Sequence, residues 1–148
     1  MAWGCAIQTQ LHRILLLQKK ALRIIFHTHF RSHTDNLFFE NNILKVSDIH
    51  LFQLGQFMYK LNKDDLPAIF SNMFCKNSSV HDYPTRQRNS YHLPPTRTLL
   101  AKNSFVFSGP VYWNSLPNDF KESPSVNIFK HKLKKMLICQ YFTHTSQD

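Results

Sequence analysis

The groups of this chain that could do chemistry are cationic side chains set beside aromatic rings. In residues 83–92 three tyrosine or histidine rings stand on either side of Arg86 and Arg88, and Arg97 and Lys102 continue the positive charge along the chain. Binding of single-stranded nucleic acid combines stacking faces with neutralisation of phosphates. The segment therefore predicts a contact with RNA or DNA. An ordinary surface loop, in which Arg86 pairs with Asp82 or with a helix C-terminus, is the open alternative.

A second cationic group falls on one face of the first predicted helix, over residues 7–26. At about 100° per residue its apolar side chains gather on one side and its cations opposite, with only Leu16 intruding. The apolar side comprises Ile7, Leu11, Ile14, Leu15, Ala21, Leu22 and Ile25, and the cationic ridge comprises His12, Arg13, Lys19, Lys20, Arg23 and His27. We predict that Arg13, Lys19, Lys20 and Arg23 bind phosphates, with an ordinary solvated face as the alternative.

The acidic, histidine and cysteine residues form no recognisable catalytic or metal-binding pattern. A polymerase needs paired aspartates that hold two divalent metals. The adjacent Asp64 and Asp65 stand before a Leu-Pro dipeptide without a preceding strand, so they predict a helix start instead. His29 and His33 are four residues apart, but no cysteine lies near them. We therefore expect no catalytic residue, no metal and no cofactor, and we expect that the chain is not an enzyme.

The composition is that of a folded, basic protein. The 148 residues include 18 Lys and Arg against 9 Asp and Glu, for a formal net charge of +9, and they include 13 Phe. This charge favours a polyanionic partner, and a basic surface that only maintains solubility is the alternative. The aromatic content excludes a disordered chain. Three widely separated cysteines, with no recognisable signal peptide or membrane span, indicate an intracellular protein of the nucleus or cytoplasm without a membrane partner.

Periodicity and capping residues predict a mainly α fold, a small helical bundle with a long irregular loop and room for one short hairpin. Beyond the first helix, we expect helices from Thr34 or Asp35 to Glu40, over 48–61 behind an N-cap at Ser47, over 64–74, over 105–116, and over 126–142 behind Ser125. Pro110 predicts a bend or a break in the helix over 105–116. The loop covers residues 75–102, with short strands at 91–93 and 98–100.

The expected organisation is one helical domain over residues 1–142, followed by a disordered tail at 143–148. Its core is predicted to include Phe57, Trp113, Leu116 and Phe129, because bulky apolar side chains recur around them at helical spacing.

Several segments resemble, in order and spacing, the C-terminal part of the reverse transcriptase of non-LTR (LINE-type, jockey-like) retrotransposons. The most informative is SGPVYWNSLP at residues 108–117. The others are AWG at 2–4, LLQKKALRII at 16–25, QLGQFMYK at 53–60, LPAIF at 66–70, TRQ at 85–87 and RT at 97–98, with Phe129 and Leu133 similar to the closing helix. The resemblance covers about residues 2–138, and seven weak segments in register make it specific.

The resemblance implies a region in the thumb, or directly after it, of an RNA-directed DNA polymerase that acts in target-primed integration. A thumb helix bundle grips a template–primer duplex through backbone contacts, which would suit the cations of residues 13–23. No segment here matches the catalytic aspartates or the endonuclease of that family. The resemblance therefore implies a non-catalytic fragment, from a truncated reading frame or from a fragment given its own gene model, that still binds RNA or an RNA/DNA duplex. The alternative is an interaction module, or a remnant, whose apolar faces docked on the polymerase palm and fingers.

Overall fold

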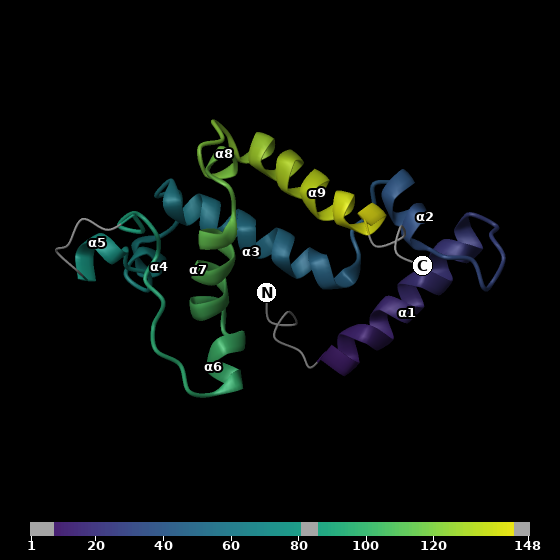
Figure 1. Ribbon diagram of the computed structural model, residues 1–148, viewed down its shortest axis with the longest axis horizontal. Coiled ribbons are helices and arrows are strands. Elements are labelled where there is room, and N and C mark those ends of the chain that lie inside the picture. The colour runs from purple at the N-terminus through teal and green to yellow at the C-terminus, as the bar shows by residue number, and fades with distance from the viewer. Residues whose placement is uncertain (1–7, 81–85, 144–148) are drawn as a thin grey trace. The chain divides into compact units, whose positions relative to one another are not determined.

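The computed structural model in Figure 1 describes residues 8–80 and 86–143. These residues are mainly helical and contain no strand, which confirms the predicted fold class. The helices are α1 (Gln8–Ile25), α2 (Asp35–Glu40), α3 (Val46–Asn62), α4 (Ala68–Ser71), α5 (Asn77–Val80), α6 (Leu99–Asn103), α7 (Phe105–Ser115), α8 (Asn118–Lys121) and α9 (Val126–Thr143). The predicted tail begins at Thr143, which instead ends α9, and residues 144–148 lie outside the described part.

The chain divides into two compact units. Unit 1 comprises residues 53–129, and unit 2 comprises residues up to 52 together with those from 130 onward. Helices α3 and α9 each contribute residues to both units. The single domain expected over 1–142 stays a prediction, and the two units are described separately below.

The core of unit 1 forms where α7 packs on the second half of α3. A Cβ atom on Gly109 would lie 2.9 Å from the Sδ atom of Met58, so only glycine permits this approach without a shift of the buried Met58 side chain. Trp113, Leu116 and Phe129 are buried. The half-buried Phe57 ring contacts the rings of Phe70, Phe74 and Phe105.

Helix α7 continues through Pro110 to Ser115, so the predicted break is wrong, while the alternative of a bend at Pro110 stays a prediction. Proline removes one backbone hydrogen bond inside a helix, at a cost of about 3 kcal/mol. Here Gly109 and Pro110 are both buried. The packing of this part of α7 against Leu54 and Met58 offsets the lost bond.

Unit 2 is held together by polar contacts between segments far apart in the sequence. The Gln18 side chain of α1 donates to the Leu44 carbonyl at 2.8 Å and accepts from the Val46 N–H at 3.0 Å. The Tyr141 hydroxyl of α9 accepts from the Lys45 N–H and donates to Asp48. Burial and the bond to Asp48 raise the pKa of Tyr141. These contacts fix the connection between α2 and α3 against α1 and α9.

Three helices end with non-glycine residues in the left-handed backbone region. His27, Asn42 and Asp64 have φ angles of 49°, 54° and 56° and follow α1, α2 and α3. After α3, the Asp64 N–H bonds to Leu61 and the Asp65 N–H bonds to Lys60, which is the Schellman pattern. Asp64 and Asp65 therefore end a helix, and the prediction that they start one is wrong. Helix α4 begins only at Ala68, after Pro67.

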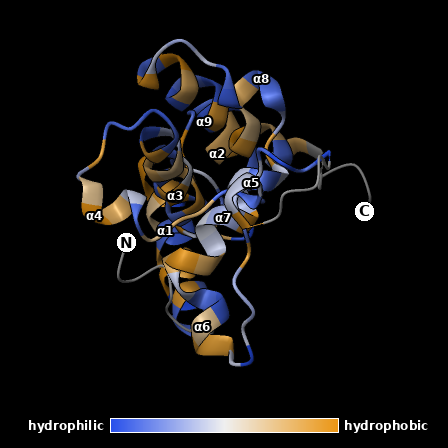
Figure 2. Ribbon diagram, turned by 90° about the vertical axis from the view of Figure 1, so that its left-hand side faces the viewer, coloured by the Kyte–Doolittle hydropathy of each residue, from blue (hydrophilic) through white to orange (hydrophobic). Residues whose placement is uncertain are grey.

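The described residues between Cys75 and Thr98 include α5 and several backbone contacts. One isolated bridge joins Lys76 to Tyr91, and the His92 N–H bonds to the Cys75 carbonyl at 2.8 Å. The predicted strand at 98–100 is wrong, because the Thr98 hydroxyl accepts from the Ala101 N–H and caps α6. Figure 2 shows hydrophobic residues on α6, where Leu99 and Leu100 are 78% and 82% exposed.

Candidate nucleic-acid interface

The cations of α1 form the first part of the candidate interface. Arg13 and Lys20 are exposed and Lys19 is partly exposed. The ion pair between Lys45 and Asp35 involves none of these three cations. Cations in this state are available to an external anion.

Arg23 has a structural role that Arg13, Lys19 and Lys20 do not share. Its Nε and Nη2 atoms donate to the Ser32 carbonyl at 3.1 and 3.0 Å, so the side chain ties α1 to the loop over residues 27–33. Replacing Arg23 would release this loop. Arg23 is therefore a positioning residue for the interface, and its remaining N–H groups stay available to a ligand.

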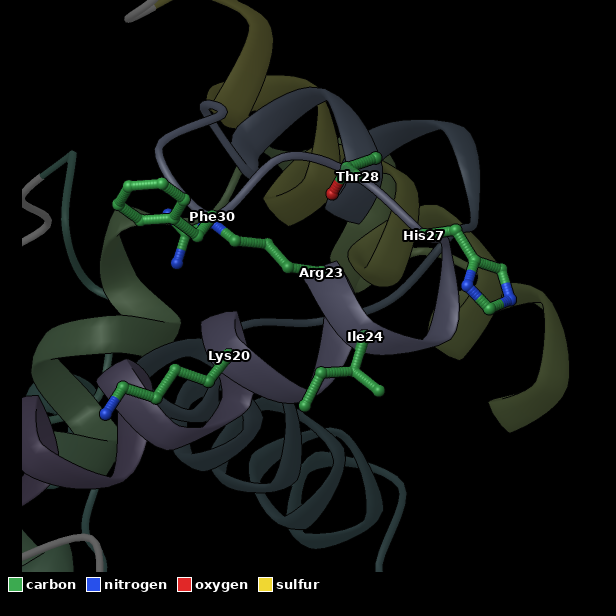
Figure 3. Close-up of a pocket in the computed structure, with 6 residues that line it drawn as sticks. All are labelled: Lys20, Arg23, Ile24, His27, Thr28 and Phe30. Atoms are coloured by element: carbon green, nitrogen blue, oxygen red, sulfur yellow. The ribbon is translucent and has the colours of Figure 1, made fainter.

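A groove about 680 Å³ in volume lies between the end of α1 and this loop. Its walls are Lys20, Arg23, Ile24, His27, Thr28 and Phe30. In Figure 3 the Arg23 side chain runs from α1 toward the loop, Lys20 and Phe30 lie toward the same end of the groove, and His27 lies at the other end. The groove thus combines cationic groups with an exposed ring and an aliphatic wall.

The backbone at the end of α1 shapes this groove. The His27 N–H bonds to Ile24 and the Thr28 N–H bonds to Arg23, which together with the positive φ of His27 form a Schellman cap. The cap turns the chain sharply back along α1, so that the loop faces the helix that precedes it. The Thr28 Oγ1 atom is buried and has no hydrogen-bond partner in the described structure.

The second predicted set of cations is dispersed over unit 1. Arg86 and Arg88 lie in the turn over 86–89, Arg97 lies in the irregular connection before α6, and Lys102 lies on α6. All four are exposed. Asp82, the alternative partner of Arg86, lies outside the described residues. The exposed side chains of these four cations are available to an anion.

The residues of the segment SGPVYWNSLP make packing and hydrogen-bond contacts within unit 1. The Asn114 side-chain amide accepts a hydrogen bond from the Tyr91 N–H at 3.1 Å and donates one to the Tyr91 carbonyl at 2.8 Å. It therefore binds both backbone groups of a residue 23 positions away in the chain. The Lys121 ammonium bonds to the Asn114 carbonyl, and burial lowers the pKa of Lys121. With Gly109 against α3 and Trp113 in the core, the segment's distinctive residues have structural contacts.

The described residues contain no cluster of three or more His, Cys, Asp or Glu side chains suited to a metal ion. None of the described helices combines the length and the apolar character needed to cross a membrane. Cys75 and Cys139 are exposed free thiols.

The sequence did not identify Phe30, Thr28 and Ile24 as interface residues. The residue types of the loop over 27–33 predict only a polar connection. Its return toward α1 depends on the positive φ angle of His27, a conformation that the sequence does not mark with a glycine. The sequence signal for this return was a histidine two residues after the last helical residue, because histidine enters the left-handed region more often than most non-glycine residues do. Comparison with protein-family models, with curated proteins and with solved structures found no match to this chain.

Proposed function

We propose that this chain is a non-catalytic, C-terminal region of a retrotransposon-type RNA-directed DNA polymerase that binds the backbone of RNA or of an RNA/DNA duplex. The observation that carries the proposal is the set of cations on α1, where Arg13 and Lys20 are exposed and Lys20 lines the groove. The resemblance of the sequence to the family's C-terminal region supports the same conclusion. Binding of this kind needs positioned cations and no reactive group.

A salt titration with a matched pair of variants tests this function. Phosphate contacts release counterions, so the affinity for an RNA/DNA duplex should fall steeply as salt rises. Replacing Arg13 and Lys20 together by Ala should weaken binding and reduce the salt slope by about two, one for each lost phosphate contact. The measurement is filter binding over a salt series. Both side chains are exposed, so the fold should be retained.

The control variant removes two lysines from another helix of the same unit, Lys134→Ala with Lys135→Ala. It lowers the net charge by the same two units as the α1 variant. The slope of its affinity against salt should lie closer to that of the unmodified chain than the slope of the α1 variant does. No detectable affinity at low salt, or an affinity independent of salt, contradicts backbone binding. A larger loss in the control than in the α1 variant contradicts the assignment to α1.

A second candidate function, docking on another protein, is favoured by an exposed apolar stripe on α1. Ile14, Leu17, Ala21 and Ile24 are spaced three, four and three residues apart, so they share one side of the helix. Ile14, Leu17 and Ile24 are 48%, 64% and 73% exposed. In a retrotransposon-type polymerase, the palm and fingers would be the partner for this stripe.

If the stripe is an interface left without its partner, the isolated chain should self-associate as its concentration rises. The double variant Leu17→Ser with Ile24→Ser should then be monomeric in size-exclusion chromatography with light scattering. The pair Leu99→Ser with Leu100→Ser, which removes two equally exposed apolar groups from α6, is the control and should not restore the monomer. A stable monomer of the unmodified chain at all concentrations contradicts the docking function.

A further inference from the structure

We propose that Phe30 is a stacking site for one unpaired base of single-stranded nucleic acid, with the adjacent phosphates bound by Lys20 and Arg31. The inference rests on the proposed nucleic-acid binding and adds the kind of strand that the α1 groove prefers. Backbone binding alone requires only cations. A stacking site also requires an accessible ring that is held in place.

The ring is accessible and has cationic neighbours. Phe30 is 68% exposed and forms part of the groove wall with Lys20 and Arg23. The Arg31 guanidinium carbon lies 5.1 Å from the centre of the Phe30 ring, and the His29 ring centre lies 4.5 Å from it. Rings interleaved with cations are the combination by which proteins bind single strands.

The loop that carries the ring is fixed by its own hydrogen bonds. Arg23 holds the Ser32 carbonyl, the Ser32 N–H bonds to the His29 carbonyl at 2.9 Å, and the Arg31 N–H bonds to His29 Nδ1 at 3.3 Å. The Schellman cap fixes where the loop leaves α1. A loop ordered before binding loses less conformational entropy when a base stacks on the ring that it carries.

The size and chemistry of the groove fit an unpaired nucleotide. Its volume of about 680 Å³ falls within the range of about 300–1,000 Å³ that small-molecule sites occupy. Ile24 supplies an aliphatic wall, and Lys20 lies toward the same end as Phe30 in Figure 3. Bases inside a duplex are stacked on each other and offer no free face, whereas unpaired bases do. The groove therefore favours a single strand.

The test compares two oligonucleotides of equal length and charge, a single-stranded oligouridine and an abasic strand with the same phosphates. Phe30→Ala should weaken binding of oligouridine by about five- to 150-fold, the loss expected for one stacked base. The same substitution should leave the affinity for the abasic strand unchanged, because that strand has no base to stack. Phe30→Trp should retain or increase the affinity for oligouridine, and the new tryptophan should be quenched by oligouridine but not by the abasic strand.

The outcomes separate this inference from the proposed function. If the unmodified chain binds both strands equally and Phe30→Ala changes neither, backbone binding stands and the stacking site is overturned. If the unmodified chain binds neither strand nor a duplex at low salt, both proposals fall. Equal weakening of both strands by Phe30→Ala also overturns stacking, since it would show a loss of loop structure. Because Phe30 is largely exposed, Phe30→Ala is expected to fold, and its thermal unfolding provides that check.

Discussion

Replacing Trp113 by Ala should lower the free energy of unfolding by about 3–5 kcal/mol, the loss typical of a buried aromatic side chain. The Trp113 side chain is 3% exposed. Its ring centre lies 6.5 Å from that of Tyr59 and 6.0 Å from that of Phe129, and Tyr59 and Phe129 stack at 4.6 Å. Truncation would therefore leave a cavity between α3, α7 and the first turn of α9.

Urea unfolding followed by circular dichroism measures this effect. Trp113→Phe keeps part of the contact and should lose less than Trp113→Ala. Leu99→Ala, at a side chain 78% exposed, is the surface control and should change stability little. An unchanged unfolding midpoint in Trp113→Ala would show that the ring is not a core residue.

The parts of the fold that depend on local sequence could be predicted. The helices expected over 7–26, 34–40, 48–61 and 126–142 have ends within two residues of those observed, because each has a periodic apolar pattern. At α9, the Ser125 hydroxyl accepts from the Ile128 N–H, as its capping pattern predicts. The Thr34 side chain, in contrast, makes no capping bond to α2.

The parts that depend on distant contacts could not be predicted. The loop over 75–98 has no periodicity of its own, and its order comes from the Lys76–Tyr91 bridge and from Asn114. Pro110 by itself predicts a bend or a break, whereas the structure continues α7 through the buried Gly109 and Pro110 without a break. On α1, the periodicity places Ile14 and Ile25 on the inner side, whereas the structure leaves them 48% and 63% exposed and buries Leu22.

In the candidate interface too, features set by local sequence could be predicted, and features set by contacts between separate segments could not. Charge and periodicity place Arg13 and Lys20 on an accessible helix face. The bond from Arg23 to Ser32 joins residues nine apart through a side chain and a carbonyl, a contact that no residue pattern marks. The sequence therefore identifies which cations could bind an anion. It does not show that Arg23, through its bond to Ser32, holds the loop that forms the groove wall.

The second large effect is expected at Asn114. Asn114→Ala removes both hydrogen bonds to the backbone of Tyr91, a residue only 5% exposed. Each buried backbone group left without a partner costs about 1–3 kcal/mol, so the loss of both bonds should lower the stability of the variant by about 2–6 kcal/mol. Burial, together with the charge of Asp64, raises the pKa of the Tyr91 hydroxyl to about 12. The hydroxyl therefore stays protonated and neutral in a measurement at neutral pH.

Urea unfolding gives the stability change, and amide hydrogen exchange locates it. Exchange should accelerate at Tyr91 and His92 more than in α1, which belongs to the other unit. Asn114→Asp keeps an acceptor for the Tyr91 N–H but sets a carboxylate against the Tyr91 carbonyl, so it should be no more stable than Asn114→Ala. Asn118→Ala, at an exposed amide four residues along the chain, should be neutral.

These variants also decide what the segment SGPVYWNSLP does. If Asn114 serves the fold alone, nucleic-acid affinity per folded molecule should be the same in Asn114→Ala as in the unmodified chain. A variant that keeps full stability but loses affinity would instead make the Asn114 amide a ligand contact. The two hydrogen bonds to Tyr91 argue for the first outcome, because one acceptor and one donor of the amide are already used inside the protein.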